Sequence, residues 1–419
     1  MKKLTVNRNE IPAGILIGIM VLYTIMPIVG RFFSSFLTTY AYMILLVILT
    51  LLIMFEHGMK TSEHFVLMTL PFMLWKVLDY IGAYGVTFSP SNAFLWGYAL
   101  LLDLLPIFAA VYLFKSHNTL IKPMAVITVV AAIVTVITTT VGLYIYPEAA
   151  RFLATDYETT NTFYITLEWM NVGGYETVYA MLLLYPLVIY AFKQKKIHLI
   201  TAIVITLILL VFILSSQYTI ALLLFIVTTF LFFTKKNLTA KRVWIMLIAA
   251  AVLIFIFWAV FSSFIEMLAK NVVSKEVSSR LLSLAGGVDG LSKSDDKRLE
   301  LYLRALNTMF RYPIIGGYWF EGSTSGHSFV LDMLANWGAL GAMALFFIYR
   351  KIYNMFYKPY RFEKGFGYIL WIFLQTIFLS TLNTGAWIAV LAFFVPILLC
   401  FIDNKREIKS VRLKVKETE

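Results

Sequence analysis

The amino-acid sequence predicts an all-α polytopic integral membrane protein with about twelve transmembrane helices. Of its 419 residues, 60% are hydrophobic and only 14% are charged, and the mean hydropathy is +0.82. Soluble domains contain roughly 45–50% apolar and about 25% charged residues. The apolar runs are about 20 residues long, the length that crosses ~30 Å of hydrocarbon as a helix. They lack the period-two alternation of a barrel, so helices are expected to satisfy the backbone in lipid.

Twelve apolar runs are the predicted spans. No small-residue cleavage site follows the first run, so it is expected to be a membrane anchor rather than a signal peptide. No internal repeat or soluble domain interrupts the series, and residues 1–419 are therefore expected to form a single transmembrane domain. The predicted spans cover residues 12–30, 39–55, 64–84, 92–114, 122–146, 175–192, 198–215, 217–234, 243–262, 328–349, 366–383 and 385–402.

The net charge of +12 indicates the positive-inside bias of a membrane protein rather than nucleic-acid binding. With the N-terminus inside, cytoplasmic segments hold 24 of the 35 lysines and arginines, and outer segments hold 10. Eight of the outer ten fall in one loop, and long loops obey the rule weakly. Both termini are therefore expected in the cytoplasm, with 403–419 as a basic cytoplasmic tail.

Two outer segments are long, and outward-facing functional groups should concentrate there. They are an extracytoplasmic loop over 147–175 and a larger one over 263–327. The single cysteine, Cys400, excludes a disulfide framework and a thiol metal site. No Asp-rich outer motif and no phosphate-binding glycine loop is present, so neither a metal nor a nucleotide cofactor is expected.

Residues 298–311 predict an amphipathic helix that ends before Pro313. Such a helix can lie in the membrane interface with its apolar side toward the lipid. The apolar face holds residues at spacings of three, four and seven, namely Leu299, Tyr302, Leu303, Leu306 and Phe310. The opposite face holds Glu300, Arg304, Asn307 and Arg311.

Arginines in the large outer loop are candidate phosphate ligands, because the guanidinium fork makes two charge-assisted hydrogen bonds. The candidates are Arg298, Arg280 and Arg304; the alternative is a solvated basic face or a contact with lipid headgroups. Of the five histidines, only His327 is predicted to face outward. A histidine near its ordinary pKa can accept a proton at neutral pH. The alternative is a structural role at the start of a span.

Three charged residues fall well inside predicted spans, away from the span ends. Lys76 and Asp79 are three residues apart on the third span, and Asp103 lies in the fourth. Charges in the bilayer are costly and are usually paired or functional. An ion pair between Lys76 and Asp79 on one helix face is the favoured interpretation. A transport pathway is the alternative, and it would normally need more such residues.

The stretch around 280–345 resembles the O-antigen polymerase and O-antigen ligase family. The resemblance rests on Arg298 in RLELYLRALNTMF, on PIIGG at 313–317, and on His327 in HSFVLDMLANWGALG. The segment SSRLLSLAGG around Arg280 is also similar. Elsewhere the likeness is limited to about twelve spans and a large outer loop between the ninth and tenth.

This resemblance implies a GT-C-like glycosyltransferase in the bacterial inner membrane, with its active site on the outer face. It implies metal-independent transfer of a glycan from an undecaprenyl-diphosphate carrier. Arg298 and Arg280 would hold the diphosphate, and His327 would be the base. The family's usual asparagine after the histidine is Ser328 here, and an arginine expected after Ser216 is Gln217. Another outer arginine, Arg151 or Arg304, would then replace that missing contact.

The function expected on these grounds is an extracytoplasmic polymerase. It would join carrier-linked repeat units into a capsular, exopolysaccharide or O-antigen polymer, with membrane lipid, a chain-length regulator and a flippase as partners. Tyr318, Trp319 and Trp169 could stack on sugars; the alternative for them is an interfacial aromatic belt. Rival functions are a ligase, a lipid-linked oligosaccharide flippase or transporter, and a non-enzymatic scaffold. A transporter should show paired half-repeats or interrupted helices, and none is evident in the sequence.

Overall fold

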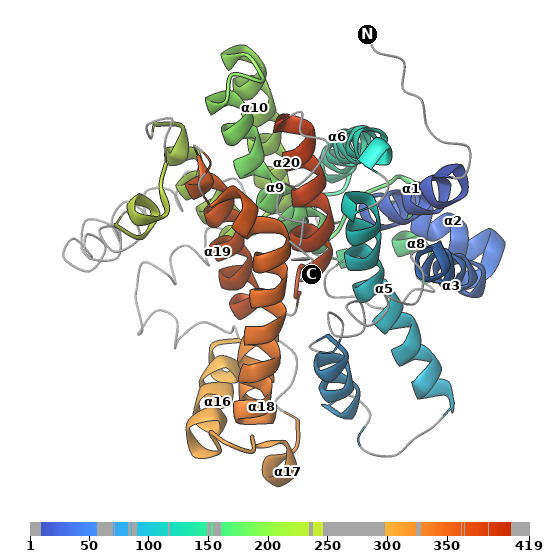
Figure 1. The fold of residues 1–419 in the computed structure, drawn as a ribbon, viewed down its shortest axis with the longest axis vertical. Coiled ribbons are helices and arrows are strands. Elements are labelled where there is room, and N and C mark those ends of the chain that lie inside the picture. Colours follow the sequence, from blue (N-terminus) through green and yellow to red (C-terminus); the bar gives the residue numbers. More distant parts are fainter. Residues whose placement is uncertain are drawn as a thin grey trace, which may run out of the picture.

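The computed structural model of the chain is helical in every element that it describes. Figure 1 shows these helices gathered into one bundle, with α16 and α17 beside one end of α18. The all-α prediction is therefore confirmed for this part of the chain. The described residues are 10–56, 70, 72–82, 85, 90–115, 118–147, 149, 152–153, 161–233, 238–245, 298–323, 328–361, 363, 365–383 and 385–403.

The helix bounds follow the predicted spans closely where both are defined. The α-helices are α1 (Ile11–Ile25), α2 (Pro27–Phe32), α3 (Thr38–Glu56), α5 (Pro90–Lys115), α6 (Ile121–Ile145), α8 (Thr162–Trp169), α9 (Tyr175–Lys193), α10 (Leu199–Ser216), α11 (Thr219–Thr229), α16 (Arg298–Arg311), α17 (Tyr318–Glu321), α18 (Phe329–Ile352), α19 (Phe366–Leu382) and α20 (Val395–Asp403). A π-helical turn, η7 (Val390–Phe394), leads into α20, and another, η5 (Tyr353–Tyr357), extends α18. Residues 72–82 are also helical.

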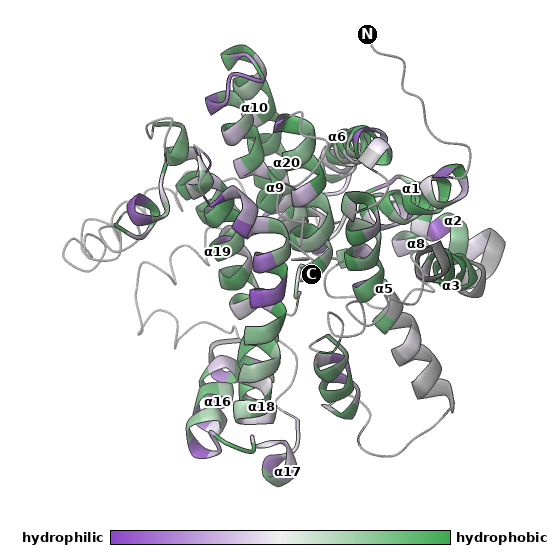
Figure 2. Ribbon diagram, viewed as in Figure 1, coloured by the Kyte–Doolittle hydropathy of each residue, from purple (hydrophilic) through white to green (hydrophobic). Residues whose placement is uncertain are grey.

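Four helices of the described part are long and apolar enough to cross a membrane, and a bent pair makes a fifth. Most residues along these helices are hydrophobic, as Figure 2 shows, and many large apolar side chains of α6 and α10 are exposed, which suits a lipid environment. They indicate a membrane protein. The four are Ile121–Ile145, Tyr175–Lys193, Leu199–Ser216 and Phe329–Tyr360, and the bent pair is Ile11–Ile25 with Pro27–Ser35.

α9 is the central helix of the bundle. Of the four spanning helices it has the largest buried share, and α10, α11, α19 and α20 all pack on it. Tyr185 is fully buried and stacks on Phe225 of α11 with ring centroids 4.8 Å apart. Tyr190 is also buried and donates its hydroxyl to Asp403 at the end of α20. Aromatic side chains thus fill the middle of the bundle, and their hydroxyl groups find acceptors there.

The first predicted span is bent, whereas the sequence predicted one continuous helix over 12–30. α1 and α2 meet at an angle of 107°. Met26 takes an extended conformation (φ −109°, ψ 108°) because the ring of Pro27 disfavours a helical residue before it. The backbone N–H of Ile28, freed at the break, donates to Oδ1 of Asn171 at 3.3 Å. The chain after the break therefore contacts the loop that follows α8.

The tenth predicted span, 328–349, is also interrupted. Gly338 has φ +51° and ψ −127°, outside the helical region. A Cβ on Gly341 would overlap the carbonyl oxygen of Met333, eight residues earlier in the chain. In a straight helix, eight residues rise about 12 Å. The helix axis is therefore sharply kinked at Gly338, which brings the backbone of Met333 against Gly341.

Candidate functional site

The predicted amphipathic helix is present as α16, which begins at Arg298 and ends at Arg311. It packs against α18. The buried positions are Ala305 and Thr308, 1% and 2% exposed, and the Tyr302 hydroxyl donates to the Leu382 carbonyl at 2.7 Å. The face of α16 that packs on α18 is therefore not the predicted apolar stripe: small residues form the contact, because they allow the two backbones to approach closely.

The charged face of α16 is exposed, as predicted. Arg311 is paired with Glu321 of α17, at 2.9 Å between Nη1 and Oε1, and Thr308 donates to the same carboxylate at 3.1 Å. Arg304 is exposed and forms no ion pair with the residues that the structure describes. Of these two arginines, Arg304 is therefore the one available to an anionic ligand.

The PIIGG turn fits into the break in α18. Gly317 N–H donates to the Ala335 carbonyl at 2.7 Å, and Ala339 N–H donates to the Ile314 carbonyl at 3.0 Å. These two bonds satisfy backbone groups that the interruption at Gly338 takes out of the helix. Gly316 has φ +83°, and a Cβ there would overlap the carbonyl oxygen of Asn336. The two glycine-containing motifs noted in the sequence thus form one interlocked unit.

The start of α18 is capped by its own sequence. Ser328 is fully buried, and its Oγ accepts from Leu331 N–H at 2.9 Å while its own N–H donates to Asp332 Oδ2 at 3.2 Å. This is a reciprocal N-terminal cap. Phe329 N–H donates to the Asn383 carbonyl at 2.9 Å, which holds the start of α18 against the end of α19. The serine that follows His327 in the sequence thus serves as a helix cap.

Several predicted site residues lie outside the described residues. They are His327, Arg280 and Arg151. Arg298 is described as the first residue of α16, and Ser328 directly follows His327. The Tyr302–Leu382 and Phe329–Asn383 bonds bring the first turn of α16 and the first turn of α18 to the same end of α19. Two of the predicted elements, the arginine-started helix and the residue after the histidine, therefore meet at one place.

Of the three aromatic residues predicted to stack on sugars, one is packed against the bundle and two are exposed. Tyr318 stacks on Trp337 at 4.9 Å and donates its hydroxyl to the Ile81 carbonyl at 2.8 Å, so its ring is a packing element. Trp319 is 55% exposed beside it. Trp169 is on α8, in the other outer segment, and is 36% exposed. Among the three, Trp319 presents the most surface.

The second outer segment is attached to α6 by a buried network that the sequence did not reveal. Asn171 has φ +57° and donates Nδ2 to Thr135 at 3.2 Å and Thr138 at 3.0 Å. Gly173 N–H donates to Thr139 Oγ1 at 2.8 Å. The threonines follow one face of α6 at spacings of three and four, the only local signal that could have indicated this contact.

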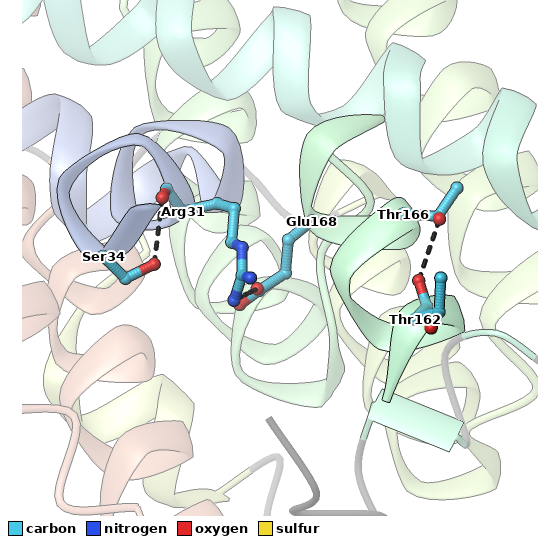
Figure 3. Close-up of polar contacts among 5 residues, drawn as sticks. All are labelled: Arg31, Ser34, Thr162, Thr166 and Glu168. Carbon is cyan, nitrogen blue, oxygen red and sulfur yellow. Dashed lines mark hydrogen bonds and ion pairs between the residues drawn. The ribbon is translucent and has the colours of Figure 1, made fainter. Parts of the chain in front are cut away.

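Arg31 forms an ion pair that the sequence analysis did not predict. Figure 3 shows it pointing from the bent first span toward Glu168 of α8, with 3.6 Å between Nη1 and Oε2. Its Nε is buried and has no hydrogen-bond partner among the described residues. Burial raises the pKa of the Glu168 carboxyl, and the Arg31 charge opposes that shift in part. The pair holds the break in the first span against α8.

Aromatic side chains gather where the α10–α11 turn meets α9. Tyr175, Tyr179, Tyr218 and Trp387 lie with ring centroids 5.4–6.2 Å apart. Gln217 caps α10 at φ +60° and donates Nε2 to the Pro147 carbonyl at 3.4 Å. The left-handed residue at this turn therefore ties the end of α10 to the start of the segment that follows α6.

The predicted Lys76–Asp79 pair is confirmed and has a third member. Lys76 is 5% exposed, and its Nζ lies 3.5 Å from Asp79 and still closer to Asp103 of α5. The ammonium also lies 4.3 Å from the centre of the Trp75 ring. Trp75 in turn contacts Phe329 edge-on at 5.3 Å. The ion cluster therefore joins segment 72–82 to α5, directly beside the start of α18.

Lys76→Met is expected to destabilise the protein by about 2–4 kcal/mol, because it leaves two carboxylates facing each other without their cation. Asp79→Asn should cost much less, since Asp79 is 54% exposed and makes the longer contact. Thermal unfolding in detergent would measure both. Equal midpoints for the two variants would contradict a structural role for the buried ammonium.

Comparison with models of known protein families and with curated proteins found no match. Among the described residues, no group of three or more His, Cys, Asp or Glu could hold a metal ion. The functional assignment therefore depends on the chain's own residues and their arrangement.

Proposed function

We propose that this protein is an integral-membrane glycan polymerase with its active site on the outer face of the bacterial cytoplasmic membrane. It transfers a glycan from an undecaprenyl-diphosphate carrier to another carrier-linked repeat unit. The product is a capsular, exopolysaccharide or O-antigen polymer. The full assignment includes twelve spans, cytoplasmic termini and a GT-C-like architecture.

One observation carries the proposal. The arginine-started helix, the PIIGG turn and the start of the helix after His327 are packed into a single unit, although these motifs were noted separately along the sequence. Gly316 and Gly338 are interlocked, and Tyr302 and Phe329 are bonded to neighbouring carbonyls at the end of α19. A unit of this kind can hold an arginine and a histidine at fixed positions around one substrate, as transfer chemistry requires.

The proposed reaction needs three protein functions. Arg298, Arg280 and Arg304 bind the diphosphate and offset its charge as it leaves. His327 accepts the proton of the acceptor hydroxyl while that oxygen forms a bond to the anomeric carbon. The bond between that carbon and the diphosphate oxygen breaks, and its electron pair leaves with the carrier. Diphosphate is a good leaving group, so neither ATP nor a nucleotide is required.

The test is a reconstitution with purified protein and its own lipid-linked repeat unit, in the presence of EDTA and without nucleotide. A ladder of lengthened lipid-linked glycans is the expected result, read on a gel. Monodisperse protein that gives no ladder would contradict polymerase activity. Addition of a different glycan acceptor would then test the ligase, and translocation of the lipid-linked unit would test the transporter.

A further inference from the structure

The unit formed by α16, α17 and the turn between them has an apolar surface that no other described residue covers. It consists of large side chains in a stretch of eighteen residues, each more than half exposed. Single exposed apolar residues are normal, but a concentration of this kind marks a contact surface. The residues are Leu303 (57%), Phe310 (75%), Ile314 (73%), Ile315 (55%), Trp319 (55%) and Phe320 (60%). They are called the apolar rim below.

The rim is separate from the surface that holds this unit to the bundle. α16 faces α18 through Ala305 and Thr308, and the turn is bonded to α18 through Gly317. Ring stacking between Tyr312 and Phe320, 4.7 Å apart, fixes α17 against the turn. The rim side chains are thus held on a rigid support. They are exposed and do not pack against the helix bundle.

The rim begins where the apolar stripe of α18 begins. Large exposed apolar residues on α18 are Leu340, Met343, Phe346 and Phe347, all after the break at Gly338. Ala339, next to Leu340, is bonded to the Ile314 carbonyl of the rim. The exposed apolar side chains of α18 are therefore continuous with the turn that carries the rim, so one apolar environment can cover both.

The polar residues beside the rim fit a membrane interface. Arg304 and Asn307 lie on the exposed polar face of α16 between the rim residues Leu303 and Phe310 in sequence, and exposed Arg311 follows Phe310. A helix with an apolar face and exposed arginines is typical of the headgroup region, where arginine meets lipid phosphate. Tryptophan at position 319 suits the same layer.

We propose that the apolar rim is inserted into the outer leaflet of the bilayer, and that α16 and α17 form an interfacial membrane anchor. The occupant of this surface is lipid, with its phosphates against Arg304. If the protein is the proposed polymerase, the diphosphate of the carrier lies at the same depth as Arg304. Only this last statement rests on the proposed function. Trp319 then anchors the unit in lipid instead of stacking on a sugar.

The anchor can be tested without any glycan substrate, so its failure is distinguishable from failure of the polymerase. Nitroxide labels would be placed in a Cys400→Ser background through Phe310→Cys, Ile314→Cys and Trp319→Cys, with Arg304→Cys and Asn307→Cys as matched polar-face controls. Each protein would be reconstituted in phosphatidylethanolamine–phosphatidylglycerol vesicles. Electron paramagnetic resonance would then compare collisions with oxygen, which enters lipid, and with a water-soluble nickel chelate.

The expected result is a ratio of oxygen to nickel accessibility at least threefold higher at the rim positions than at the two controls. Equal ratios in the two sets would overturn the proposal. Dipolar broadening at rim positions that disappears on dilution with unlabelled protein would also overturn it, because the surface would then be covered by a second copy. Monodisperse elution of each variant before reconstitution excludes misfolding as the cause.

Discussion

His327→Ala is expected to lower the rate of glycan transfer by about 100- to 10,000-fold, the usual contribution of a general base. The acceptor hydroxyl would then lose its proton only to water while it attacks the anomeric carbon. The measurement is the rate at which the glycan ladder lengthens in the reconstituted system. Arg298→Ala should lose about 100- to 1,000-fold, because a positioned donor to the departing charge is removed.

Matched controls separate this chemistry from general damage. His198 is the exposed N-cap of α10, and Arg350 is exposed near the far end of α18. His198→Ala and Arg350→Ala should keep the wild-type rate. Arg298→Lys should recover only part of the loss, since lysine keeps the charge but not the two-pronged geometry. A His327→Ala protein with a wild-type ladder would remove His327 from the mechanism.

The helices could be predicted from the sequence because each signal is local. Apolar runs of the right length gave α6, α9, α10 and α19 to within a few residues. The amphipathic spacing of apolar residues predicted α16, and Pro313 predicted where this helix ends. Which residues of each apolar run are buried could not be predicted in the same way, because residues that face lipid and residues that face protein are both mostly apolar. α16 shows the same limit on the surface, where Ala305 is buried and Phe310 is not.

The contacts that shape the candidate site join residues far apart in the chain. Ile28 meets Asn171, and Arg31 meets Glu168, because Pro27 bends the first span toward the outer loop. No local pattern links these positions. Asp103 likewise joins Lys76 from another helix. The glycines were visible in the sequence, but only the structure shows that PIIGG and the glycine of NWGALG fit together.

The close fit between the PIIGG turn and the break in α18 underlies the second large predicted effect, which is on stability. Gly316→Ala is expected to destabilise the protein by about 4 kcal/mol or more, in the exceptional range for a single substitution. A Cβ at this position would overlap the carbonyl oxygen of Asn336, and φ is already +83°. The atoms closest to that Cβ all belong to the backbone of Asn336 and Trp337, so none of them can rotate away. The turn must move from α18, and the bonds from Gly317 to Ala335 and from Ala339 to Ile314 are lost with it.

Gly322 offers a control that separates backbone strain from the clash. Its φ is +77°, close to that of Gly316, but a Cβ there would meet nothing within 4 Å. Gly322→Ala should therefore cost only the strain of its backbone conformation (φ +77°, ψ −172°), on the order of 1–3 kcal/mol. Thermal unfolding in detergent would compare the two variants, and glycan transfer should fall with Gly316→Ala alone. Similar midpoints would mean that the turn and the break in α18 are not interlocked, and the fixed placement of arginine and histidine that the proposed chemistry needs would lose its physical basis.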